Sequence, residues 1–249
     1  MELKLTHVTK QYGTKTAVDH INMTLREGIY GLLGANGAGK TSLMRLVCLI
    51  QKRSGGEITL DGREIQEMGE EYRSLLGYLP QNFGYYPEFT AQKFLLYMSA
   101  LKGLNKHAAK RRIEELLDVT GLTDDRNRKI KTFSGGMKRR LGIAQAMLNN
   151  PKILILDAIT SAVDTATDEQ IRRAFLEEIT DTTKLIIAQR ISSVQDADRI
   201  LVLDDGRVNG FDTHENLLAN NNIYKEIYET QIKGGGDFDQ AGKKTGGAA

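Results

Sequence analysis

The pattern of apolar and polar positions predicts strands near the start of the chain and helices in its middle. Residues 3–12 and 16–25 alternate apolar with polar side chains on either side of Gly13, which is typical of an antiparallel hairpin. Further strands are expected at residues 28–33, 55–62 and 76–80. Residues 94–101 and 108–119 instead carry apolar side chains at intervals of three and four, as amphipathic helices do. The middle of the chain is therefore expected to be mostly helical.

Beyond Pro151 the pattern changes to short apolar runs separated by helical stretches. We expect strands at residues 153–157, 184–188 and 199–204, and helices at 168–179 and 192–197. Parallel sheets produce nearly continuous apolar strands, because helices cover both of their faces. The chain is therefore predicted to have an α/β fold with a buried parallel sheet.

Composition narrows the classes of protein to which the chain can belong. Lys and Arg number 34 and Asp and Glu 32, so the formal charge is +2, without the basic excess of a nucleic-acid-binding protein. Hydrophobic residues make up 40% of the chain, yet its longest aliphatic strings, such as Ile153–Leu156, are far shorter than a membrane span. Cys48 is the single cysteine, and charged side chains interrupt the first ten residues, where a secretory leader would be apolar. A cytoplasmic location and no internal disulfide are expected.

The end of the chain differs from the rest in composition. Residues 233–249 are poor in apolar side chains, and six of the last sixteen residues are glycine. Such a segment buries too little apolar surface to offset the entropy lost on ordering. We therefore predict a flexible tail at residues 233–249 and one domain at residues 1–232, without the internal repeats of a solenoid.

A phosphate-binding loop is predicted between the third strand and the helix that follows it. Residues 34–41, GANGAGKT, match the eight-position pattern GxxxxGK[ST]. The glycines let the backbone curl around a phosphate, so that N–H groups and the helix N-terminus face the anion. Lys40 would bring its charge to the β- and γ-phosphates, and Thr41 would offer a hydroxyl to Mg²⁺. The expected ligand-binding residues are Gly34, Asn36, Gly37, Ala38, Gly39, Lys40, Thr41 and Ser42.

An acidic residue follows the most apolar run of the chain. Asp157 comes directly after the four aliphatic residues 153–156. The carboxyl ends of parallel strands face the ligand crevice in α/β sheets. An aspartate after four aliphatic residues is, by itself, equally a common way to end a strand. Beside a phosphate loop, however, Asp157 is expected to hold Mg²⁺ through water.

A phosphate loop indicates the class of ligand but not the biological function. A third motif indicates the protein family. Residues 133–140, FSGGMKRR, resemble the signature motif of ABC-type ATPases and lie about twenty residues before Asp157, as in that family. The resemblance covers about residues 2–230. It implies a P-loop NTPase with a RecA-like parallel-sheet core, an N-terminal antiparallel β-subdomain and a helical signature subdomain at about 90–150. It also makes residues 1–232 an ABC ATP-binding domain, with ATP and Mg²⁺ as its cofactors.

The same resemblance assigns roles outside the phosphate loop. Tyr12 is placed like the aromatic residue that stacks on adenine, and Gln81 like the Q-loop glutamine, which reaches both Mg²⁺ and the membrane subunit. Asp164 ends the segment SAVD, which resembles the D-loop. Tyr12 could equally be an ordinary strand residue, and Gln81 could simply precede an aromatic-rich turn at residues 82–87.

The signature is expected to act on a second molecule. Ser134 is a favourable helix N-cap, and the amides that follow it are donors, so this corner would form a second anion cradle. Its residues are Ser134, Gly135, Gly136 and Met137. A plain capping role is the alternative. ABC domains dimerise head to tail, and each signature closes over the other subunit's nucleotide, so the resemblance implies a second ABC ATPase domain as partner.

Two positions depart from the family's pattern. Ala158 stands where efficient members place the glutamate that polarises the attacking water, and Gln189 stands where they have a switch histidine. A methyl group accepts no proton, and an amide lacks the charged form of imidazole. Losing a general base costs about a hundred- to ten-thousandfold in rate. We expect a degenerate site that binds ATP and hydrolyses it slowly. An engineered glutamate-to-alanine change would explain Ala158 but not Gln189.

The two parts of the chain resemble different members of the family. Residues 1–156 are similar to ATP-binding subunits of the bacitracin-resistance or ABC-2 type, and residues 155–242 to the degenerate ATPase domain of heterodimeric ABC exporters. The chain thus resembles a chimera joined near Leu156. Natural recombination, a misassembled gene and a deliberate fusion all fit this pattern.

Taken together, these resemblances imply the ATP-binding subunit of an ABC transporter. It would lie on the cytoplasmic face of the cell membrane and couple MgATP binding and slow hydrolysis to export through separate transmembrane subunits. No nucleic-acid partner is expected. One alternative is a nucleotide-binding regulatory partner without turnover, which Ala158 and Gln189 suggest. Another is a non-transport ABC protein of translation or DNA repair, which would need a second ATPase domain or a long coiled coil. The signature argues against a small-molecule kinase.

Overall fold

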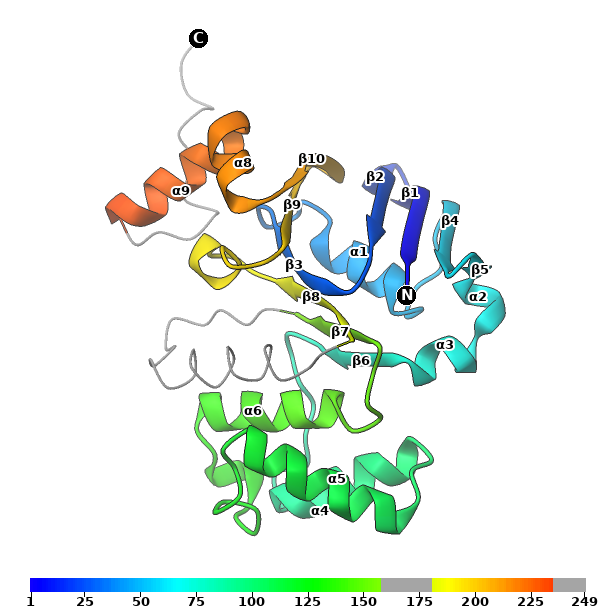
Figure 1. Cartoon of the computed structure of the whole chain (residues 1–249), viewed down its shortest axis with the longest axis vertical. Coiled ribbons are helices and arrows are strands. Elements are labelled where there is room, and N and C mark those ends of the chain that lie inside the picture. The colour runs from blue at the N-terminus through cyan, green and yellow to red at the C-terminus, as the bar shows by residue number, and fades with distance from the viewer. Residues whose placement is uncertain (158–180, 235–249) are drawn as a thin grey trace. The chain divides into compact units, whose positions relative to one another are not determined.

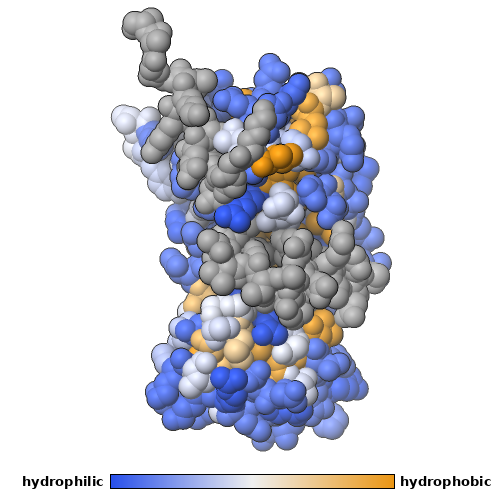
Figure 2. All heavy atoms as spheres, turned by 90° about the vertical axis from the view of Figure 1, so that its left-hand side faces the viewer, coloured by the Kyte–Doolittle hydropathy of each residue, from blue (hydrophilic) through white to orange (hydrophobic). Residues whose placement is uncertain are grey.

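The structure is a computed structural model that describes residues 1–157 and 181–234 of the chain. The described residues form two compact units (Figure 1). The first unit consists of residues 1–73, 157 and 183–234, and the second consists of residues 74–156 and 181–182. On the face drawn in Figure 2, hydrophilic residues dominate the surface and hydrophobic residues form smaller groups between them.

An antiparallel sheet makes up one part of the first unit. β1 (Leu3–Tyr12) pairs with β2 (Lys15–Leu25) and with β4 (Gly55–Leu60), which in turn pairs with β5 (Arg63–Glu64). The alternation read from the sequence is present in the burial of β1, where Leu3 and Leu5 are 1% exposed while Lys4 is exposed. The hairpin expected on either side of Gly13 is therefore confirmed.

A largely parallel sheet forms the other part of the first unit. β3 (Gly28–Leu33) pairs in parallel with β8 (Thr183–Ile187) and with β9 (Arg199–Asp204). The parallel strands expected from the apolar runs are thus confirmed, since all five residues of β8 are buried. β9 continues into an antiparallel partner, β10 (Arg207–Asp212), which the sequence pattern did not predict.

Four of the described α-helices lie within the first unit, and α3 ends one residue beyond its boundary. They are α1 (Lys40–Val47), α2 (Ile65–Met68), α8 (His214–Asn220) and α9 (Asn222–Gly234), while α3 spans Glu70–Ser74. The helix expected at residues 192–197 is wrong. Only a 3-10 turn, η2 (Ile191–Ser193), forms there. The segment is too short for a stable helix, and the N–H of Asp198 donates to the carbonyl of Ile29, which returns the chain to the sheet.

The second unit combines a pair of parallel strands with a helical region. β6 (Leu76–Leu79) pairs with β7 (Ile153–Leu156), and all four residues of β7 are buried. The helices are α4 (Ala91–Leu101), α5 (Lys106–Val119), the 3-10 helix η1 (Ile130–Thr132) and α6 (Gly135–Ala146). The helices expected at 94–101 and 108–119 lie within α4 and α5 and are confirmed. The helix expected at 168–179 lies outside the described residues.

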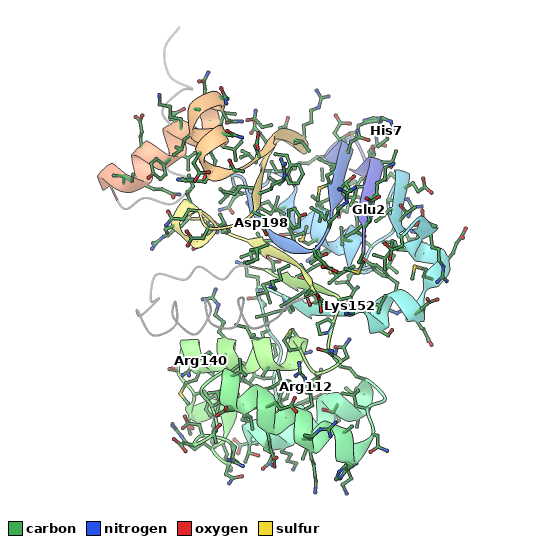
Figure 3. The ribbon with its side chains drawn as sticks, in the orientation of Figure 1. Glu2, His7, Arg112, Arg140, Lys152 and Asp198 are labelled. Atoms are coloured by element: carbon green, nitrogen blue, oxygen red, sulfur yellow. The ribbon has the colours of Figure 1, made fainter. Side chains whose placement is uncertain are left out.

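Side chains at the helix ends hold the helical region together. Arg140 of α6, labelled in Figure 3, donates from Nη1 to the carbonyls of Thr120 and Gly121 just beyond α5, at 3.1 Å each. Lys102 donates to Asn149 at 2.7 Å, and Asn149 donates in turn to the carbonyls of Ser74 and Leu76. These bonds satisfy carbonyls that a helix end or strand end would otherwise leave unpaired. None of the described helices is long and apolar enough to cross a membrane.

Candidate functional site

The loop between β3 and α1 can be built only from glycine at two of its positions. Gly39 has a φ of +101°, and a Cβ placed there would lie 2.1 Å from the carbonyl oxygen of Ala17. A Cβ at Gly34 would lie 2.4 Å from the carbonyl oxygen of Leu203. Real carbon–oxygen contacts do not become this short, so the carbonyl oxygens of Ala17 and Leu203 occupy the space that these side chains would need. The neighbouring strands therefore require glycine at both positions.

Neighbouring strands brace this loop from outside. The N–H of Gly206, in the turn between β9 and β10, donates to the carbonyl of Ala38 at 3.0 Å, and the carbonyl of Gly206 accepts from the N–H of Asp19 at 2.8 Å. Arg207 forms an ion pair with Asp19 at 2.7 Å on the same turn. The sequence pattern did not indicate a role for Asp19, Gly206 or Arg207. The dipeptide Asp205–Gly206 between two apolar runs is a turn signal that could have indicated the hairpin.

The difference between two glycines of the loop gives a test of this geometry. Gly39→Ala is expected to lower the free energy of unfolding by more than 3 kcal/mol, a rough figure, because it combines a strained φ with a backbone collision. Gly37→Ala is the matched control, since Gly37 also has a positive φ, +88°, but no atom lies within 4 Å of its added Cβ. Thermal or urea unfolding measures both. Equal destabilisation by the two substitutions would contradict the packing described for Gly39.

The N-terminus of α1 lacks an anionic group of its own. Its N-cap, Gly39, offers no side chain, and its first turn contains no acidic residue. The first N–H groups of a helix have no partner within the helix, and the helix dipole favours an anion beside them. In the loop, Asn36 and Gly37 are exposed, as is Thr41 in the first turn of α1. This end of α1 therefore has the accessibility and the donors that a phosphate group requires.

Lys40 is held against the loop itself. Its ammonium group donates to the carbonyls of Gly34 and Ala35, at 2.5 and 2.8 Å, and the residue is only 9% exposed. Ser42, two residues further along the same helix, lies with its hydroxyl 3.5 Å from the hydroxyl of Tyr12. The cationic group predicted to meet the β- and γ-phosphates is thus fixed inside the loop.

Asp157 belongs to the same unit as the loop, and its carboxyl group is electrostatically coupled to it. The residue is 6% exposed, and burial raises the pKa of its carboxyl group, whereas the charges of Lys40 and Arg45 act in the opposite direction. A buried carboxylate near a helix N-terminus and a lysine is a suitable oxygen ligand for a hard cation. Within residues 1–157 and 181–234, no group of three or more His, Cys, Asp or Glu side chains could hold a metal ion.

The register of the parallel strands brings Gln189 to the edge of the sheet where the loop begins. Ile187 pairs with Leu32, and the N–H of Ala188 donates to the carbonyl of Leu32 at 3.0 Å. Continuing this register puts Gln189 level with Gly34, the first residue of the loop. The backbone of Gln189 is further held by Gln231 of α9, a contact that nothing in the sequence indicated. Ala158 and Asp164 lie outside the described residues.

Tyr12 lies at the end of β1 with part of its ring exposed. The side chain is 42% exposed, and its hydroxyl donates to Oε1 of Gln51 at 2.5 Å. The ammonium group of Lys10 lies 5.1 Å from the centre of the ring. The ring is therefore oriented by a hydrogen bond at one end and retains accessible aromatic surface, as a base-stacking residue needs.

Gln81 and the signature residues belong to the second unit. Gln81 is exposed just beyond β6, and the loop after it contacts α6, since Tyr85 lies 5.2 Å below the ammonium group of Lys138. The hydroxyl of Ser134 accepts the N–H of Met137 at 3.2 Å, so the capping role left open by the sequence is present. Ser134 and Gly135 are nevertheless exposed, and a Cβ at Gly135 would meet nothing within 4 Å.

Comparison with known proteins gives one family. Residues 18–161 match the family described as "ABC transporter". The bacitracin transport ATP-binding protein BcrA of Bacillus licheniformis is 32% identical over 229 residues, which are 90% of this chain and 74% of that protein. This similarity extends across Leu156, where the sequence resembles a junction between two lineages.

Two solved structures resemble the chain in fold. A bacterial Atm1-family ABC exporter with ATP bound has a TM-score of 0.83 and 25% identity, covering 92% of this chain and 42% of that chain. The dimeric structure of MJ0796, a bacterial ABC transporter cassette, has a TM-score of 0.75 and 26% identity, covering 85% of this chain and 98% of that chain. The chain thus spans less than half of the exporter and nearly the whole of the cassette.

Proposed function

Because this chain belongs to the family of ABC transporter ATP-binding proteins, we propose that it binds MgATP at residues 34–42 and couples that binding to movement of separate transmembrane subunits. The observation that carries the proposal is the braced loop at the N-terminus of α1, with Lys40 and Asp157 in the same unit. The architecture of a P-loop NTPase in the ABC cassette fold agrees with it.

Each residue of the site has a distinct role in this proposal. Backbone N–H groups from Asn36 to Thr41 bind the phosphates, and Lys40 neutralises charge on the β- and γ-phosphates. Thr41, Asp157 and Gln81 are the proposed ligands for Mg²⁺. When bound there, the metal would neutralise negative charge on the phosphates. Tyr12 stacks on the adenine, and Ser42 supports the phosphate end of the site from α1.

The partner that completes the site is a second ABC ATPase domain. The exposed corner formed by residues 134–137 is a helix N-terminus with an open glycine beside it, which suits a phosphate approaching from another molecule. The similarity to a dimeric cassette supports this arrangement. In such a dimer Asp164 would face the partner. The chain can thereby supply an intact signature to its partner's nucleotide even where its own turnover is slow.

A cluster of aromatic side chains after Gln81 is the proposed contact with the transmembrane subunit. Tyr86 and Tyr97 are 47% and 39% exposed, and the rings of Tyr86, Phe89 and Tyr97 lie within 6.0 Å of one another, centre to centre. Clustered aromatic side chains with exposed surface are suited to a protein partner. Docking there would hold this chain on the cytoplasmic face of the membrane.

Slow hydrolysis follows from the two departures from the family pattern. Ala158 provides no proton acceptor at the general-base position, and Gln189 can donate or accept a hydrogen bond but cannot carry the charge of an imidazolium. The alternative function, a regulatory partner that binds ATP without any turnover, rests on the same two residues. Single-turnover measurements distinguish the two, because a slow enzyme converts its bound ATP to ADP and the regulatory partner does not.

Replacing Lys40 tests the ATP-binding proposal directly. Lys40→Ala is expected to weaken MgATP binding at least about tenfold, since it removes the cation that meets the phosphates. Isothermal titration calorimetry of the purified chain measures this affinity. Lys110→Ala, a change on the exposed face of α5, is the matched control and should bind as the unsubstituted chain does. If Lys40→Ala bound MgATP with unchanged affinity, the proposed site would be wrong.

A further inference from the structure

One side chain of α9 makes two hydrogen bonds to the backbone of the segment that contains Gln189. Nε2 of Gln231 donates to the carbonyl of Gln189 at 3.0 Å. Oε1 of Gln231 accepts from the N–H of Ile191 at 2.9 Å. The segment at residues 189–191 and the helix α9 are about forty residues apart in sequence and lie beside each other in the first unit (Figure 1).

The primary amide of Gln231 makes this pair of bonds because it carries a donor and an acceptor on separate atoms. The carbonyl of Gln189 requires a donor, and the N–H of Ile191 requires an acceptor, so both the type of side chain and the orientation of its amide are specified by the backbone. Glutamate would offer two acceptors and no donor, and methionine would have the same length but neither function. The side-chain amide of Gln231 therefore pairs with this backbone as a peptide group of a neighbouring strand would.

The bond to Ile191 also caps the 3-10 helix η2. Arg190, at the N-cap position, makes no capping bond with its own side chain, because a guanidinium group has no acceptor. Ile191 is 1% exposed, so its N–H has little access to water. Gln231 thus supplies, from another element, the acceptor that the local sequence lacks.

Together with β3, this contact fixes the backbone on both sides of Gln189. The N–H of Ala188 is bound to the carbonyl of Leu32, and three residues further on the N–H of Ile191 is bound to Gln231. Residues 189 and 190 lie between these two points, and the carbonyl of Gln189 is bound as well. The position of Gln189 at the start of the phosphate loop therefore depends on α9.

The face of α9 that carries Gln231 is anchored in the first unit. Tyr224 and Ile227, which precede Gln231 by seven and four residues and so share its face, are 0% and 3% exposed. The hydroxyl of Tyr224 lies 2.7 Å from Nδ1 of His214 in α8. Because this face of α9 is buried, the backbone that carries Gln231 is fixed. The side chain can therefore restrain residues 189–191.

We propose that Gln231 is a positioning residue, which holds residues 189–191 so that Gln189 meets the γ-phosphate of bound ATP. This inference rests on the proposed function for the role of Gln189. It adds to that function a mechanical link from the C-terminal helix to the nucleotide site. Release of Gln231 would leave the phosphate loop intact, since that loop is bound to the N–H of Gly206 through the carbonyl of Ala38.

The test compares Gln231→Met with Gln231→Glu and with a neighbouring control. Gln231→Met keeps the length and removes both bonds, and Gln231→Glu keeps only an acceptor for Ile191. Ile232→Ala alters the next side chain of the same helix, which is 65% exposed, and serves as the control. In the purified chain, amide hydrogen exchange reports on Ile191, calorimetry reports on MgATP affinity, and single-turnover kinetics report on hydrolysis.

We expect Gln231→Met to speed exchange of the Ile191 amide at least about tenfold and to slow single-turnover hydrolysis about three- to tenfold, the scale of one or two lost hydrogen bonds. MgATP affinity should stay within about twofold, because the loop and Lys40 are unchanged. In Gln231→Glu, the amide of Ile191 should exchange more slowly than in Gln231→Met, because an acceptor remains. Single-turnover hydrolysis should nevertheless be slower than in the unsubstituted chain. A merely structural role would not separate affinity from hydrolysis in this way.

Two results have different meanings. If the unsubstituted chain bound no MgATP, the proposed function would fail, whatever Gln231 did. If the chain bound MgATP and Gln231→Met matched Ile232→Ala in both exchange at Ile191 and hydrolysis, the positioning role would be overturned while the proposed function stood. An equal loss of affinity and hydrolysis, with faster exchange throughout the first unit, would also overturn it, because it would indicate general destabilisation.

Discussion

Restoring glutamate at position 158 and histidine at position 189 is expected to raise ATP turnover about a hundred- to ten-thousandfold. The double substitution Ala158→Glu and Gln189→His supplies a general base for the attacking water and a group that can carry positive charge near the γ-phosphate. Phosphate release from the purified chain, alone and mixed with a competent ABC domain, measures the effect. MgATP affinity should change much less than turnover, because the residues that bind the phosphates are untouched.

A matched variant separates the base from the shape of its side chain. Ala158→Gln with Gln189→His has nearly the same volume as the restored pair but provides no carboxylate. It should remain within about tenfold of the unsubstituted chain. Equal activation by both pairs would show that the loss of a base at position 158 does not limit turnover. Fast turnover of the unsubstituted chain would contradict the degenerate site altogether.

Asp157→Asn is expected to lower magnesium-dependent turnover strongly and at the same time to stabilise the protein. The proposed metal ligand is lost, so turnover should fall at least about a hundredfold. The carboxylate is also costly to the fold, because burial raises its pKa more than Lys40 and Arg45 lower it. Replacing it by a neutral amide should therefore raise the melting temperature at neutral pH in the absence of nucleotide. Asp118→Asn, on the exposed surface of α5, is the control and should change neither quantity.

The stabilisation by Asp157→Asn should depend on pH in a defined direction. A carboxyl group with a raised pKa prefers its protonated form in the folded state, so its penalty is fully present above the folded-state pKa. As the pH falls through that pKa towards the ordinary value of 3.8, the unsubstituted protein becomes protonated and the difference between the two proteins closes. Melting curves at several pH values measure this difference. If the difference in melting temperature between the two proteins grew as the pH fell, burial would not be the main cause of the shift in the pKa of Asp157.

The sequence predicted those features that depend on local pattern. Alternation identified β1 and β2, and the apolar run before Asp157 identified β7. The phosphate loop could be found because glycine is required at fixed positions of its sequence. At Gly39, for example, a Cβ would collide with a neighbouring carbonyl oxygen. Gln81, Asp157 and Gln189 were located by motif, and their proposed roles await the experiments above.

What the sequence did not predict depends on contacts between distant segments. Gln231 looks like any polar residue on a helix, and only the folded chain brings it to Ile191. The helix expected at residues 192–197 was wrong because a hydrogen bond from Asp198 to Ile29 draws the chain into the sheet, which a local pattern does not reveal. Figure 3 labels Asp198, whose carboxylate also accepts the N–H of Ile29, at 2.7 Å.

The bracing of the phosphate loop by the turn at Gly206 has a consequence for nucleotide exchange. Because Ala38 and Asp19 are both tied to Gly206, the curvature of the loop is set by the β9–β10 hairpin and not by its ligand. A nucleotide then binds to a preorganised scaffold and does not have to order it. Departure of ADP and arrival of ATP would leave this part of the protein unchanged, and discrimination between the two must come from the groups that meet the γ-phosphate.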